Sequence, residues 1–112
     1  MKKENNIKDL RRDVICEDAI LWLKMEQTLA PASLVTSLPD ISEFTGITLD
    51  EWKNWFMQTA ELVFKKTHNN GVTIFYQSDI KYKGIWLDKS FLCQKVAEKL
   101  GHQLLWHKII CR

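Results

Sequence analysis

Apolar residues follow two different spacings along the chain, and each spacing is typical of one kind of element. Short runs rich in β-branched residues, such as 13–16 and 72–76, are typical of strands. Segments in which apolar residues recur every three or four positions, such as 49–63, are typical of helices that bury one face. The two kinds of segment alternate from one end of the chain to the other.

The first half of the chain predicts a strand, a short helix, a strand and a long helix. Residues 13–16 form the first strand, and an acidic turn then opens the short helix. The apolar run 33–36 forms the second strand. That strand ends before Pro39, because proline lacks an N–H and restricts Leu38 to extended conformations. Thr48 and Glu51 have the spacing of a capping box, so the long helix begins there.

The second half predicts a strand, a loop, a helix and a last strand. Asn70-Gly71 ends the long helix, and the continuous apolar run 72–76 fits a parallel strand covered on both faces. Residues 80–86 form a polar and aromatic loop. Asp88 caps the next helix, and the run 103–111 forms the final strand. The whole order, β-α-β-α-β-α-β, predicts the α/β class with a mostly parallel sheet and flanking helices.

Composition indicates one globular domain preceded by a charged extension. The chain has 112 residues, of which 46% are hydrophobic, enough for one core. Residues 1–12 form the extension, and 13–112 form the domain. No run approaches the ~18 apolar residues of a membrane helix, and the extension leads into no apolar signal region. We therefore expect a cytoplasmic protein that does not enter a membrane.

The net charge of +2 is unevenly distributed. Residues 1–12 carry five Lys or Arg against two acids, and residues 81–112 carry seven against two. This asymmetry suits a phosphate-bearing partner such as DNA or RNA, although Lys-rich termini are more often solvated faces. We expect no metal site, because the histidines and cysteines lack ligand spacing, and we expect the cysteines to be reduced core residues. The residues concerned are Cys16, Cys93, Cys111, His68, His102 and His107.

From residue 13 onward the chain resembles the catalytic-region half of DNA amino-methyltransferases, in the class where this half precedes the cofactor-binding half. The resemblance rests on CEDAILWL at 16–23, on LVTSLPD at 34–40 and on later segments such as LWHK at 105–108. The corresponding strand and loop of the family typically read Ile-Val-Thr-Ser-Pro-Pro-Tyr. The resemblance implies a partial Rossmann-like methyltransferase fold, S-adenosylmethionine as cofactor, and methyl transfer to an amino group of a nucleic-acid base.

The resemblance also implies roles for the loop after the second strand. Ser37 would hold the amino group of the flipped base, and Pro39 would keep the turn rigid. Leu38 stands where the family has its first proline, and Asp40 stands where it has an aromatic residue. Asp40 would then accept a substrate hydrogen bond or act as a base. Phe44 would stack on the base, or would instead be a hydrophobic staple at the start of a helix.

The resemblance assigns the cofactor contacts to acidic residues after the first strand. Glu17 and Asp18 would contact the adenosine moiety, whereas the alternative for Asp18 is a helix cap. No Gly-x-Gly turn occurs in the chain, and in the family that turn would follow the position of Arg112. We therefore expect a fragment or a half-domain that is inactive without its cofactor-binding half. Its unpaired strand edges would favour self-association or a partner.

A second hypothesis is a non-catalytic module that binds nucleic acid. The segment after the third predicted strand carries cations and aromatic rings close together, as stacking and phosphate contact require. Its candidate residues are Lys81, Tyr82, Lys83, Trp86 and Lys89. A third hypothesis is a structural or regulatory subunit whose unpaired strand edges form the interface.

Overall fold

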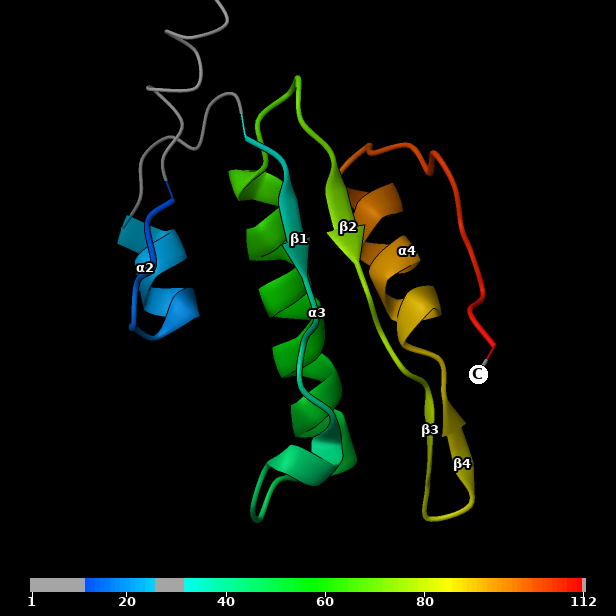
Figure 1. The fold of residues 1–112 in the computed structure, drawn as a ribbon. Helices are drawn as coiled ribbons and strands as arrows, with labels where there is room; N and C mark the ends of the chain where they lie inside the picture. The colour runs from blue at the N-terminus through cyan, green and yellow to red at the C-terminus, as the bar shows by residue number, and fades with distance from the viewer. Residues whose placement is uncertain (1–11, 26–31, 112) are drawn as a thin grey trace, which may run out of the picture.

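The computed structural model describes residues 12–25 and 32–111. In these ranges the chain forms three α-helices, one 3-10 turn and four short strands, and the strands form two separate two-stranded sheets (Figure 1). The protein is therefore a small mixed α/β domain. Of the expected extension 1–12, all but Arg12 lies outside the described residues.

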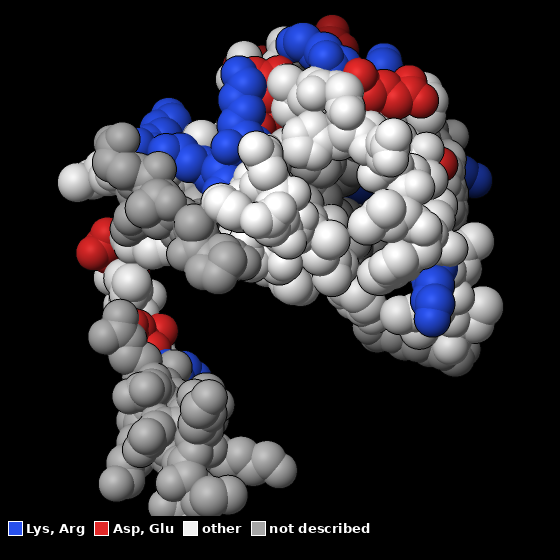
Figure 2. Space-filling model, turned by 90° about the horizontal axis from the view of Figure 1, so that it is seen from above, with Lys and Arg blue, Asp and Glu red and all other residues white. Residues whose placement is uncertain are grey.

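The centre of the fold is a parallel pair of strands. β1 (Leu34–Thr36) pairs with β2 (Thr73–Phe75), and Val35 lies opposite Ile74. This confirms the two central predicted strands. The helices α3 (Leu49–Lys66) and α4 (Lys89–Lys99) lie behind the pair (Figure 1). Charged residues gather on that helical side of the molecule, whereas the side that carries the strands is mostly uncharged (Figure 2).

The long helix α3 begins where the capping box predicts. The Thr48 hydroxyl accepts from the backbone N–H of Glu51 at 3.2 Å, and the Glu51 carboxylate accepts from the Thr48 N–H at 3.1 Å. The helix ends at Lys66, four residues before the predicted end. Thr67 ends it, because its hydroxyl bonds the Val63 carbonyl at 2.9 Å and meets the Thr73 hydroxyl at 2.6 Å. The chain is thereby turned toward β2.

The core lies between α3, α4 and the segments that lead into them. Trp52 and Phe56 of α3 are fully buried, with ring centroids 5.1 Å apart. Nearer the end of α3, Phe64 packs edge-on against Phe75 of β2, with ring centroids 5.3 Å apart. The remaining buried members of the cluster are Leu38, Ile41, Ala60, Leu87, Leu92, Cys93 and Val96.

The expected loop at 80–86 is an antiparallel hairpin. β3 (Ile80–Tyr82) pairs with β4 (Ile85–Leu87). Lys83 and Gly84 form its two-residue turn with φ of 49° and 81°, as hairpin turns with two positive φ values require. The prediction of a loop was wrong. Ile80, Lys81 and Tyr82 do alternate between apolar and polar, as a half-exposed strand does, but the run is only three residues long.

The helix α4 follows the hairpin directly and matches its prediction. The Asp88 carboxylate accepts from the Phe91 N–H at 3.0 Å, so Asp88 is the N-cap. Gly101 follows the helix with φ of 78°, a left-handed conformation that glycine adopts without strain. In the described residues no helix has the length and apolar character needed to cross a bilayer.

The first and last predicted strands do not form. Residues 13–16 and 103–111 have neither helix nor strand structure and are exposed to solvent. Each segment is apolar enough for a strand, yet a strand also needs an adjacent edge to pair with. The helix α2 (Ala19–Met25), which follows the first of them, has no buried residue. Both predicted outer strands, and with them a mostly parallel sheet, were therefore wrong.

The cysteines differ sharply in accessibility, which contradicts the prediction that all three lie in the core. Cys16 and Cys111 are exposed, whereas Cys93 is buried and its burial raises the thiol pKa to about 12. In a Cys111→Ser variant at pH 8, we expect Cys16 to react with a disulfide reagent at once and Cys93 to react only as the protein unfolds. Equal rates for the two thiols would contradict the packing of α4.

Candidate functional site

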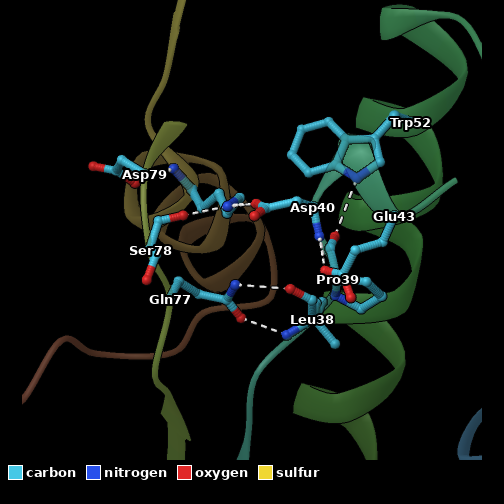
Figure 3. Close-up of polar contacts among 9 residues, drawn as sticks. Leu38, Pro39, Asp40, Glu43, Trp52, Gln77, Ser78 and Asp79 are labelled. Carbon is cyan, nitrogen blue, oxygen red and sulfur yellow. Dashed lines mark hydrogen bonds and ion pairs between the residues drawn. The ribbon is translucent and has the colours of Figure 1, made fainter. Parts of the chain in front are cut away.

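The candidate site lies where the two parallel strands end. The carboxyl ends of neighbouring parallel strands meet at one edge, which is where open α/β sheets bind ligands. Here the loop 37–40 follows β1, and residues 77–79 follow β2. Figure 3 shows the two segments facing each other. Ser37, the first residue of the loop, is exposed.

Gln77 fastens the two segments through its side-chain amide. Its Oε1 accepts from the Leu38 N–H at 2.6 Å, and its Nε2 donates to the Leu38 carbonyl at 3.0 Å (Figure 3). A proline at position 38 would lack that N–H. Leucine, which is also buried in the core at 8% exposure, therefore has a structural role where the methyltransferase loop has its first proline.

The rest of the loop is fixed by α3 and by its own turn. The indole N–H of Trp52 donates to the Pro39 carbonyl at 3.2 Å. The 3-10 turn η1 (Ile41–Glu43) follows, and the Glu43 carboxylate accepts from the Asp40 N–H at 2.7 Å. The carbonyls of Leu38 and Pro39 both accept hydrogen bonds from within the protein.

Asp40 forms an ion pair with a buried lysine. The Lys89 side chain is 1% exposed, and its ammonium group contacts the Asp40 carboxylate and donates to the Ser78 carbonyl. The backbone N–H of Lys89 donates to Asp79 Oδ1 at 2.9 Å. Desolvation lowers the pKa of the Lys89 ammonium group. One side chain at the start of α4 thus joins both loops, and the Asp40 carboxylate is engaged inside the protein.

Phe44 packs within the protein. Its ring lies 4.9 Å from that of Trp55 in an edge-on arrangement, and the residue is half-buried against the core. The ring therefore packs against α3. Because Thr48 is the N-cap of α3, the staple positions of that helix are Ile47 and Trp52, so Phe44 is not a hydrophobic staple.

The hairpin presents several exposed cationic and aromatic residues. Lys81 and Trp86 are cross-strand partners, so their side chains lie on the same face. Trp86 is 63% exposed. At the turn, the Lys83 ammonium lies 5.3 Å from the centre of the Tyr82 ring. The hairpin begins directly after residues 77–79, so it extends from the edge where the strands end.

Comparisons of the chain with protein-family models, curated proteins and solved structures find no match.

Glu17 and Asp18 belong to a different part of the molecule. Asp18 Oδ1 accepts from the N–H groups of Ile20 and Leu21 at 2.9 and 3.1 Å, so it caps α2. Glu17 is exposed beside a shallow hollow of about 230 Å³ that Trp22 also lines. Between Arg12 and Glu17, where the description of the structure begins, no strand is formed, and the sequence contains no Gly-x-Gly turn. The described residues do not by themselves fit S-adenosylmethionine, and they include no group of three or more His, Cys, Asp or Glu side chains placed to hold a metal ion.

Two residues of the site were missed or misplaced by sequence reasoning. Gln77 follows a predicted parallel strand, and its place at the carboxyl end was the available signal. Lys89 was expected in the exposed basic set but is buried at 1% exposure, which corrects that prediction. Its burial depends on Asp40, which is distant in sequence, so no local pattern indicates it.

The ion pair predicts unequal effects for its two members. Asp40→Ala leaves a buried ammonium group without its partner, so we expect a loss of about 3 kcal/mol or more in unfolding free energy. Lys89→Met leaves a carboxylate on a side chain that is 24% exposed, against 1% for Lys89, so we expect a smaller loss.

Urea denaturation of both variants and of the double variant measures the coupling, with Asp50→Ala on the exposed first turn of α3 as the control. The double variant should lose less than the sum of the single losses. Additive and equal losses would show that the pair does not hold the loops together.

Proposed function

We propose that this chain is a methyltransferase-like α/β domain that binds single-stranded nucleic acid and does not transfer methyl groups on its own. The observation that carries the proposal is the exposed pair of Lys81 and Trp86 on the hairpin next to the strand ends. The parallel unit of β1, α3 and β2 supports the methyltransferase-like, Rossmann-type part of the proposal.

The Lys81 and Trp86 pair offers both contacts that single strands need. An exposed indole face stacks on a base whatever its identity, and a neighbouring ammonium group binds the adjacent phosphate. Lys83 adds a second cation at the turn, next to the Tyr82 ring. Because these contacts read no base edge, binding of this kind has little sequence specificity.

The loop 37–40 supports the non-catalytic part of the proposal. Methyl transfer to an amino group needs acceptors that hold its hydrogens and direct its lone pair. The Leu38 and Pro39 carbonyls accept from Gln77 and Trp52, and Asp40 pairs with Lys89. The Ser37 hydroxyl is exposed and, among the contacts of the described residues, forms no hydrogen bond. It is therefore the candidate in this loop to accept a hydrogen bond from an amino group. A cofactor-binding half from elsewhere would have to supply S-adenosylmethionine before Ser37 could act on a base.

Substitution of the hairpin residues tests the proposal. We expect Trp86→Ala to weaken binding of a fluorescently labelled single-stranded oligonucleotide about tenfold or more, because stacking one base is worth about 1–3 kcal/mol. Lys81→Glu should weaken binding further and reduce its dependence on salt. Fluorescence anisotropy at several salt concentrations measures both effects.

Lys24→Glu, the same charge reversal on the exposed helix α2, is the matched control and should change affinity little. Equal losses for Lys24→Glu and Lys81→Glu would mean that net charge alone drives binding. Unchanged binding in Trp86→Ala would remove the hairpin from the interface.

A further inference from the structure

One edge of β2 is open. In the pair with β1, the Val72 carbonyl accepts from Leu34 at 3.0 Å and the Tyr76 N–H donates to Thr36 at 2.9 Å. Successive residues of a strand direct their backbone groups to opposite edges, so those of Thr73 and Phe75 point away from β1. Within the described ranges no other strand pairs with that edge.

The C-terminal segment, residues 103–110, is an unpaired apolar stretch. Every residue in it is exposed, and in the part of the chain that the structure describes none of its backbone groups has a recorded hydrogen bond. A cluster of large apolar side chains exposed in this way is typical of a surface that another chain covers. The exposures are 62% for Leu104, 70% for Leu105, 57% for Trp106, 84% for Ile109 and 64% for Ile110.

A long groove of about 1110 Å³ separates the open edge from the C-terminal segment. Residues 72–79 line one wall, the C-terminal segment lines the other, and α4 contributes Cys93 and Ala97. The charged residues that line it are Asp79, Glu98 and Lys108. Two of the three are acidic, which disfavours a nucleic-acid occupant.

The walls indicate what the groove accepts. Unpaired backbone lines both of them, so an extended polypeptide can form hydrogen bonds on both of its edges. A small apolar molecule would leave those backbone groups unpaired. The chain itself carries a matching segment, because residues 103–110 are apolar and lack backbone partners.

We infer that the groove binds the C-terminal segment of a second copy of this chain. In the resulting sheet, each C-terminal segment lies between β2 of the partner copy and the partner's own C-terminal segment. The strand order is β1, β2, partner segment, own segment, partner β2, partner β1. A two-fold axis between the two segments makes them antiparallel, and the assembly closes as a dimer.

The exchange is reciprocal, so one arrangement satisfies both copies. Each groove is filled, each open β2 edge is paired, and the exposed Leu105 and Ile109 side chains gain an apolar environment. The inference is independent of the proposed function, because the exposed Lys81 and Trp86 belong to the hairpin and not to the groove walls.

Sedimentation equilibrium of the full chain, with far-ultraviolet circular dichroism to confirm folding, tests the inference. The expected mass is twice the chain mass of 13.2 kDa. Ile109→Lys places a charge in the interface and Leu105→Pro removes a backbone donor, so both should shift the protein to the monomer mass. Val14→Lys is the matched control, because Val14 is 83% exposed and Ile109 is 84% exposed. Val14 does not line the groove, so this variant should remain dimeric.

Hydrogen exchange should show slow amides at residues 73–77 and 103–110 in the dimer and fast amides in the Ile109→Lys monomer. A monomeric wild-type protein throughout the micromolar range would overturn the inference. So would a dimer that survives both variants, an open series of larger assemblies, or a groove filled by a different protein.

Discussion

The parallel pairing of β1 with β2 across α3 is the constraint on which the rest of the structure depends. Parallel strands need a crossover, and α3 supplies it with a face that buries Trp52 and Phe56 completely. Because both strands run the same way, their loops emerge at one edge. The loop 37–40 and residues 77–79 can therefore be joined by Gln77, and both can be reached by Lys89 from the start of α4.

At that edge, the groups that hold the loop in place are different from the groups that are accessible to a ligand. Hydrogen bonds and an ion pair inside the protein occupy most of the polar groups that resemble a methyl-transfer loop. A buried ammonium group such as that of Lys89 is tolerable only with its partners in place, so the loop is held firmly. The accessible cation and aromatic ring lie instead on the hairpin, where Lys81 and Trp86 are side by side. The proposed binding without catalysis rests on this division.

The elements that the sequence predicted correctly are those with local signals. Thr48 and Glu51 mark the start of α3, Asp88 marks the start of α4, and the apolar runs of β1 and β2 are continuous. The outer strands were mispredicted because strand formation depends on a partner edge, which a local pattern does not report. The hairpin was missed because each of its strands is only three residues long, too short for a clear alternation. Of the site, the position of the loop was predictable, but the pairing of Asp40 with Lys89 was not, since it depends on the packing of α4.

The central claim is that the hairpin beside the strand ends holds nucleic acid while the chain alone holds no methyl donor. Amide chemical-shift mapping of the isotope-labelled protein tests both parts in one experiment. Titration with a single-stranded oligonucleotide should shift residues 80–87, and titration with S-adenosylmethionine should shift none of the described residues. Oligonucleotide shifts confined to α2, or specific S-adenosylmethionine shifts at Glu17 and Asp18, would contradict the account.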